Sequence, residues 1–137
     1  MRLLSLLLML WPVLAAAQDV SPADARAVRT VIEAQLDAFK HDDAKRAFSY
    51  ASPGIRESFG NAQNFLAMVR VQYPAVYRPK SVAFQSPEIV AGDLVQPVIF
   101  TDAAGDVWLA LYPMQKDASG RWRINGCQLT RVKGQQT

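Results

Sequence analysis

The sequence predicts one α+β domain, with helices in its first half and antiparallel strands in its second half. Over residues 22–73, apolar side chains recur at spacings of three and four, the period of an amphipathic helix. After Pro79 the pattern changes to short strand-like segments separated by turn residues. Helices that precede a run of hairpin-connected strands are typical of the α+β class. A chain of 137 residues is long enough to bury a core as one domain.

The N-terminal residues predict export. Arg2 precedes an apolar run over residues 3–14, and small residues up to Ala17 follow it. This order is typical of a cleavable signal peptide, and the run is shorter than the roughly 20 residues that cross a bilayer. We therefore expect residues 1–17 to be removed and residues 18–137 to form a periplasmic or secreted domain. No cysteine follows the run as a lipid acceptor, so no stable membrane anchor is expected after cleavage. The alternative is an uncleaved N-terminal anchor.

The first helix is predicted to begin at Ser21 and to end near His41. Ser21 can cap the helix, Pro22 suits its first position, and Asp24 lies where a capping-box acid would lie. Apolar residues then form one stripe along the helix at Val28, Ile32, Leu36 and Phe39.

The next segments predict two more helices. Either Asp42 or Asp43 can cap a second, shorter helix, and Ser52 with Pro53 restarts the chain in a turn that Gly60 ends. The buried face of this second helix is predicted at Ala44, Ala47, Phe48 and Ala51.

Asn61 can cap a third helix that ends at Pro74. The packing stripe of this helix is predicted at Phe65, Met68, Val69 and Tyr73.

Four strands are predicted after the helices, joined by short turns that favour antiparallel hairpins. Tyr77 and its flanking residues are expected to add a short edge strand. The four predicted strands span residues 81–90, 94–102, 106–115 and 121–130.

The segment 107–114 is apolar at nearly every position, whereas a half-exposed strand would alternate. Both faces of this strand are therefore expected to be covered, one by the helices and the other by a partner chain, a ligand or a strong curl of the sheet. We take the pattern as evidence for a homodimer that packs sheet on sheet. Trp108, Tyr112 and Met114 are the predicted interface of such a homodimer. The alternative is that these three residues form a second cluster within one protomer.

Composition narrows the chemistry of the domain. The formal charge of +3 is spread along the chain, which argues against nucleic acid as a partner. The single cysteine, Cys127, cannot form an internal disulfide. It is interpreted as a small buried hydrophobic residue, and the alternative is a reactive thiol.

The usual catalytic sets have no counterpart in the sequence. The single histidine, His41, lies in a polar link between helices, and one histidine with one cysteine is too few for a zinc site. No glycine-rich phosphate loop and no EF-hand-like acidic loop occur. We therefore predict no catalytic residue, no metal site and no cofactor.

The order of elements resembles the cone-shaped fold of nuclear transport factor 2 and ketosteroid isomerase. This resemblance implies that helices pack into the concave side of a curved antiparallel sheet of four to five strands. Residues 119–124, a glycine turn followed by a tryptophan strand, resemble the segment that often closes such domains.

A second resemblance is to a family of small exported bacterial proteins, domain of unknown function 4864. It implies export and a single domain, and it carries no activity because the family has no assigned one. The segments that carry it are residues 35–39, 47–56, 65–70, 73–79 and 108–114.

Tyrosines and arginines in the 50–79 region are the candidate ligand-binding residues. In a cone-shaped fold this region would lie near the mouth of a cavity. There arginine can hold a carboxylate and a tyrosine hydroxyl can donate a hydrogen bond, which suits a small anionic or aromatic molecule. The alternative is structural, with arginines capping carbonyls and tyrosines filling the rim of the core. The candidates are Tyr50, Arg56, Arg70, Tyr73, Tyr77 and Arg78.

Three functions remain open from the sequence. The leading hypothesis is a non-catalytic exported domain that binds a small ligand or a protein partner of the cell envelope. The second is an isomerase, cyclase or dehydratase that acts on a small hydrophobic substrate through one buried acid. The acids considered for that role are Asp37, Glu57, Glu88 and Asp102. The third is an interaction module with an exposed apolar patch and no cavity.

Overall fold

A computed structural model describes residues 19–133 of the chain. The predicted signal peptide, residues 1–17, lies outside the described residues. Within the described part, no helix is both long enough and apolar enough to cross a membrane.

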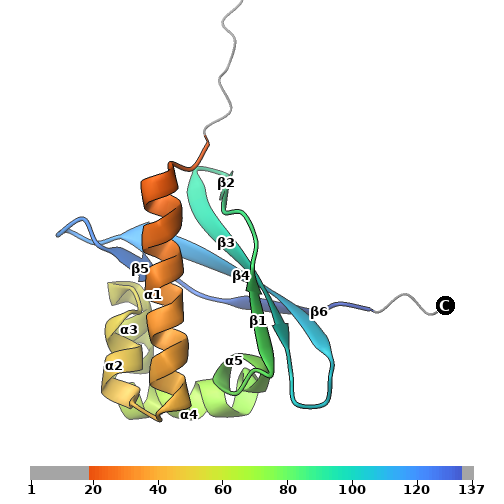
Figure 1. The fold of residues 1–137 in the computed structure, drawn as a ribbon. Helices are drawn as coiled ribbons and strands as arrows, with labels where there is room; N and C mark the ends of the chain where they lie inside the picture. The colour runs from red at the N-terminus through yellow and green to blue at the C-terminus, as the bar shows by residue number, and fades with distance from the viewer. Residues whose placement is uncertain (1–18, 134–137) are drawn as a thin grey trace, which may run out of the picture.

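The described chain has the predicted α+β class, with helices first and an antiparallel sheet after them (Figure 1). Two short helices add to the three expected ones. Pro74 ends the preceding helix as predicted and also begins the last one, because its fixed φ suits a first helical position. Tyr77 therefore lies in a helix, and the prediction of an edge strand there is wrong. The helices are α1 (Pro22–Lys40), α2 (Ala44–Ser49), α3 (Pro53–Phe59), α4 (Ala62–Gln72) and α5 (Pro74–Tyr77).

Side-chain caps begin the first four helices, as the sequence predicts. In each, the cap oxygen accepts a hydrogen bond from the backbone N–H three residues further on, at 2.8–3.3 Å. The structure decides between the two candidates for α2 in favour of Asp43. The caps are Ser21, Asp43, Ser52 and Asn61.

Six strands form one antiparallel sheet around the central pair β3 and β4. Strands β1 and β2 both pair with β3, and strands β5 and β6 both pair with β4. The strands are β1 (Ser81–Phe84), β2 (Glu88–Val90), β3 (Asp93–Thr101), β4 (Val107–Lys116), β5 (Trp122–Ile124) and β6 (Gln128–Arg131).

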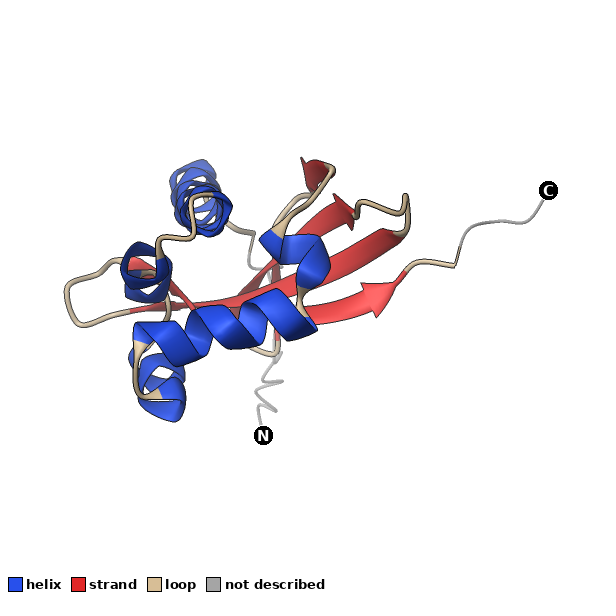
Figure 2. Ribbon diagram, turned by 90° about the horizontal axis from the view of Figure 1, so that it is seen from below, coloured by secondary structure: helices blue, strands red, loops and turns tan. Residues whose placement is uncertain are grey.

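The two outer predicted strands are each split in two. The ladder stops between Phe84 and Glu88 on one edge and between Ile124 and Gln128 on the other. Gly126, with a φ of 139°, occupies the second break in a conformation that side chains rarely adopt. Breaks in both outer strands let the sheet curl into a half-barrel, and the strands fan out when seen from below (Figure 2).

The helices pack against the inner face of this sheet. In Figure 1, α1 runs upright, α2 and α3 lie to its left, and α4 and α5 lie at its lower end. Along β3 and β4 burial alternates, so that every second side chain enters the core. The inward residues include Val98, Phe100, Ala110, Tyr112 and Met114.

The inward position of Tyr112 and Met114 corrects the predicted interface. Both side chains are at most 4% exposed and belong to the core of one protomer, so they cannot contact a second copy. Trp108 shares their side of β4, and its indole N–H donates a hydrogen bond to Asp102 at 3.0 Å. The outward residues of β4 are instead Leu109 and Leu111, which are half-buried.

Backbone hydrogen bonds join the helical half directly to the sheet. Ser52 N–H donates to the Ile124 carbonyl at 2.8 Å, and Ile124 N–H donates to the Tyr50 carbonyl at 2.9 Å. The segment between α2 and α3 therefore continues the edge of β5, and the two halves share one interior.

Candidate functional site

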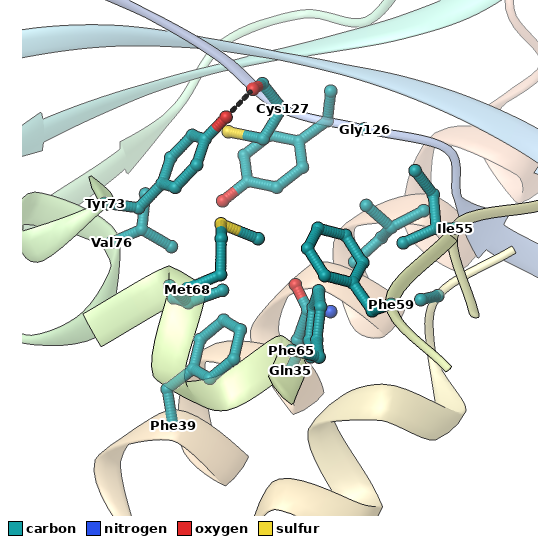
Figure 3. A pocket seen from close by; sticks show the side chains of 14 residues that line it. Gln35, Phe39, Ile55, Phe59, Phe65, Met68, Tyr73, Val76, Gly126 and Cys127 are labelled. Carbon is teal, nitrogen blue, oxygen red and sulfur yellow. Dashed lines mark hydrogen bonds between the residues drawn. The ribbon is translucent and has the colours of Figure 1, made fainter. Parts of the chain in front are cut away.

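An apolar cavity of about 160 Å³ lies between the helices and the inner face of the sheet (Figure 3). Its walls come from α1, α3, α4, α5, β4, β5 and the break at residues 126–127. Aromatic and aliphatic side chains make up most of the surface. The principal apolar residues are Phe39, Ile55, Phe59, Phe65, Met68, Val69 and Val76.

Phe65 of α4 organises the aromatic wall. Its ring centroid lies 6.0 Å from that of Phe39 and 5.6 Å from that of Phe59, so one helix contacts rings from two others. Tilted and edge-on pairs of this kind stabilise packing beyond the area they bury. Phe65 therefore joins side chains of α1, α3 and α4 in one aromatic cluster.

The covering helix α3 is held less firmly. None of its residues is fully buried, and Ile55 and Phe59 line the cavity from a half-buried position. A short helix with few buried contacts is an element that opens at low free-energy cost. We therefore expect α3 to be the wall of the cavity that opens most readily.

Two polar side chains of the cavity are already hydrogen-bonded. The Tyr73 hydroxyl donates to the Cys127 carbonyl at 3.1 Å, where the break between β5 and β6 leaves that carbonyl outside the ladder (Figure 3). The Gln35 amide donates to the Ala47 carbonyl at 3.1 Å and fastens α1 to α2. Both contacts stabilise the walls.

A third polar group has no partner. Tyr112 is 1% exposed, and its hydroxyl makes no hydrogen bond of regular geometry to any described residue. The thiol of Cys127, a weak hydrogen-bonding group, lies beside it. Leaving a buried hydroxyl unpaired costs on the order of 1–3 kcal/mol, and native proteins rarely tolerate it without a reason.

The cavity is electrically neutral. Burial raises the pKa of the Cys127 thiol to about 12 and raises the pKa values of the Tyr73 and Tyr112 hydroxyls. All three groups are therefore protonated at neutral pH, and Cys127 is not a thiolate nucleophile there. Among the described residues that line the cavity, none is an aspartate, glutamate, lysine, arginine or histidine.

Of the six candidate ligand-binding residues, the cavity contains Tyr73. The other five lie elsewhere. Arg56 is exposed on α3, and Tyr50 is half-buried beside β5, which its carbonyl contacts. The predicted single mouth of tyrosines and arginines is therefore not formed.

Arg70, Tyr77 and Arg78 instead surround Asp42 in the turn between α1 and α2. Arg78 donates to the Asp42 carboxylate at 3.2 Å and to the Phe39 carbonyl at 2.5 Å, and the Tyr77 hydroxyl also donates to Asp42. Arg70 lies 3.6 Å from the same carboxylate. The Tyr77 hydroxyl bond and the two arginines hold the pKa of Asp42 below its usual range. This cluster ties α4 and α5 to the end of α1, the structural alternative considered from the sequence.

The acids considered for catalysis are also outside the cavity. Asp37 is exposed on α1 and pairs with Arg46 at 2.7 Å. Asp102 accepts from Trp108 in the turn between β3 and β4. Glu57 and Glu88 are exposed on α3 and β2.

Sequence reasoning missed Gln35 and placed Tyr112 on the wrong side of its strand. Gln35 lies three residues after Ile32 and four before Phe39, so it is a polar residue on the apolar stripe of α1. A polar residue at such a position indicates a hydrogen bond inside the core, as Gln35 makes to the Ala47 carbonyl. For Tyr112 no local signal exists, because an unbroken apolar run does not reveal which alternate residues face inward.

A curled antiparallel half-barrel with helices on its inner side defines an α+β domain, and a neutral apolar cavity lies between the helices and the sheet. The chain belongs to the family described as domain of unknown function (DUF4864), whose sequence profile matches residues 21–137. The resemblance to this family drawn from the sequence is thereby confirmed. No curated protein and no solved structure significantly matches the chain.

Proposed function

We propose that this protein is a non-catalytic binding domain that takes one small apolar molecule into the cavity between its helices and sheet. The observation that carries the proposal is the cavity itself. A concave space of about 160 Å³ with almost wholly apolar walls and a few polar groups is the usual form of a small-molecule site.

The size of the cavity limits the ligand. A dry apolar cavity of about 150 Å³ is large enough to bind benzene, whereas sites for drug-sized molecules measure about 300–1,000 Å³. The cavity of about 160 Å³ therefore suits a molecule with a single ring.

The neutral walls favour binding over proton-transfer catalysis. An isomerase or dehydratase of the kind considered from the sequence needs a desolvated carboxylate as its base. The cavity-lining residues of the described chain offer tyrosine, cysteine and glutamine instead. The same neutrality revises the expected ligand from an anion to an uncharged molecule, because burying an unpaired charge is very costly.

The proposal also concerns where the protein works and which fold it is related to. We infer that the domain works in the periplasm or outside the cell, supported by the signal-like pattern of residues 2–17. We also infer a distant structural relation to nuclear transport factor 2-like cones, supported by helices followed by a curled antiparallel sheet.

Titration of the purified domain with toluene, followed by NMR, tests the binding proposal. Amide shifts should concentrate at α3, α4 and β4, and they should disappear in Val69→Phe, which fills the cavity from α4. Val71→Phe is the matched control, because Val71 is on the same helix and is 76% exposed. An absence of binding, or toluene binding that survives in Val69→Phe, would contradict the proposal.

A further inference from the structure

The Tyr112 hydroxyl is a polar group of the cavity that has no hydrogen-bond partner in the described part of the surrounding fold. Tyr112 belongs to the centre of β4, away from both sheet edges, where it pairs with Gln96 of β3 and lies just beyond the end of the β6 ladder at Leu111. Its ring packs against Phe100, with centroids 6.5 Å apart, so the side chain is held in place. A fixed, buried hydroxyl without a partner is the arrangement that a bound molecule can complete.

The remaining walls limit how many polar contacts a ligand can make. The Tyr73 hydroxyl donates its hydrogen bond to the Cys127 carbonyl, and the Gln35 amide donates to the Ala47 carbonyl. The other side chains around the space are apolar or the weakly polar Cys127. Tyr73 and Gln35 keep their acceptor oxygens, but among the described lining hydroxyls it is Tyr112 whose O–H donor has no acceptor, so a matching ligand presents one oxygen to it and is otherwise apolar.

Access to the hydroxyl requires a lining side chain to move. The hydroxyl has no solvent contact, and Met68 of α4 lines the same cavity (Figure 3). A methionine side chain is unbranched and adapts readily to a new neighbour. Met68 is thus the residue that we expect to shift when a ligand reaches Tyr112.

We propose that the cavity selects neutral single-ring molecules that carry one hydrogen-bonding oxygen, such as a phenol or a cyclic ketone, by pairing that oxygen with the Tyr112 hydroxyl. This inference rests on the proposed binding function and adds the chemical class of the ligand. It makes Tyr112 the residue that determines specificity, while the size of the cavity determines affinity for any single ring.

Isothermal titration with p-cresol and p-xylene tests the inference, because the two probes have nearly the same shape and differ by a hydroxyl in place of a methyl group. The wild-type protein should prefer p-cresol by about tenfold, the size expected of one hydrogen bond that satisfies a buried group. Benzoate, a charged single-ring probe, should not bind. Equal affinities for p-cresol and p-xylene would overturn the inference while leaving the binding function intact. If neither probe binds, the proposed function fails as well.

Tyr112→Phe and Tyr73→Phe form a matched pair of variants in the same cavity. Tyr112→Phe should lose the preference for p-cresol and keep or raise the thermal midpoint, because it removes an unpaired hydroxyl. Tyr73→Phe should keep the preference, because its hydroxyl already serves the Cys127 carbonyl. A preference that persists in Tyr112→Phe would overturn the inference. A clear fall in stability of that variant would also overturn it, since the hydroxyl would then have a partner in the free protein.

Discussion

At the scale of single residues, two tyrosine hydroxyls in one cavity differ in what they contribute to the stability of the fold. The Tyr73 hydroxyl satisfies a carbonyl that the sheet leaves unpaired, whereas the Tyr112 hydroxyl has no partner among the described residues. Burial alone would suggest that both tyrosines stabilise the fold equally. Their hydrogen bonds predict that only the Tyr73 hydroxyl does so.

Replacing Tyr73 with phenylalanine should lower the free energy of unfolding by about 1–2 kcal/mol, because the Cys127 carbonyl loses its donor. Urea denaturation followed by circular dichroism measures this difference. An unchanged unfolding midpoint would show that water replaces the tyrosine as donor.

Asp117, in the turn between β4 and β5, makes stability depend on pH. The Ser119 hydroxyl, the backbone N–H groups of Ser119 and Arg121, and Arg123 surround its carboxylate and lower its pKa from 3.8 to about 2. Because the folded state holds the proton less tightly than the unfolded state, Asp117 stabilises the fold above about pH 4. This contribution is lost as the pH falls toward 2.

Asp117→Asn should therefore be less stable than the wild type near neutral pH and should lose less stability on acidification. Unfolding midpoints in urea at about pH 6 and about pH 2.5 provide the comparison. Parallel losses in the two proteins over that interval would assign the acid sensitivity to other carboxylates, such as Asp42.

At the scale of elements, the start of α3 connects the helical half to the sheet. The Ser52 side chain caps α3 by accepting from Ile55 N–H at 3.3 Å, and it donates to the Asn125 side chain at 2.8 Å in the break after β5. One buried serine therefore holds a helix and an edge of the sheet together.

Ser52→Ala should cost about 0.5–2 kcal/mol of stability, the usual range for loss of a helix cap. Ser58→Ala is the matched control, because Ser58 is exposed on the same helix and bonds only to the Gly54 carbonyl within it. Thermal unfolding of both variants gives the comparison, and equal losses would contradict the special role of Ser52.

The weakly buried α3 also predicts where the domain opens. Amides of α3 should exchange with deuterium faster than those of α1 and α4, because α3 has no fully buried residue. Under the proposed function, p-cresol should slow exchange in α3 more than in β1, which is remote from the cavity. Uniform exchange across α1, α2, α3 and α4 would refute α3 as the wall that opens most readily.

At the scale of the whole molecule, one face of the sheet has helices on it and the other has none of the described helices. In the middle of β3 and β4 the outward side chains are apolar and half-buried, with Ile99 opposite Leu109 in the ladder. The sequence feature that suggested a homodimer, an apolar strand without alternation, therefore corresponds to this outer face. The homodimer expected from the sequence therefore predicts a contact through Leu109 and Leu111 in place of Tyr112 and Met114.

Light scattering after size-exclusion chromatography should find a dimer at tens of micromolar, and Leu109→Lys should convert it to a monomer. Val71→Lys, at a position that is 76% exposed on α4, should leave the dimer intact. A wild-type monomer at that concentration would contradict the predicted dimer.

Particular elements show which features of the fold could be predicted from the sequence. The caps at Ser21, Ser52 and Asn61 were predictable because a cap acts on a backbone group three residues away. The division of the strand predicted over residues 121–130 was not, because the break depends on how the sheet curls. The Asp42 cluster was also out of reach, since its partners lie 28 to 36 residues further along the chain.

The sequence by itself determined the α+β class, the order of helices and strands, the helix caps and the membership of the family, because each depends on short-range patterning or on similarity along the chain. Only the tertiary structure decided which face of β4 is buried, that Tyr112 lies beside the cavity without a partner, and that the arginines stabilise a turn. A shift of one residue in register would turn every side chain of a strand to its other face. For that reason the cavity on which the proposed function rests becomes visible only when the sheet and helices are assembled.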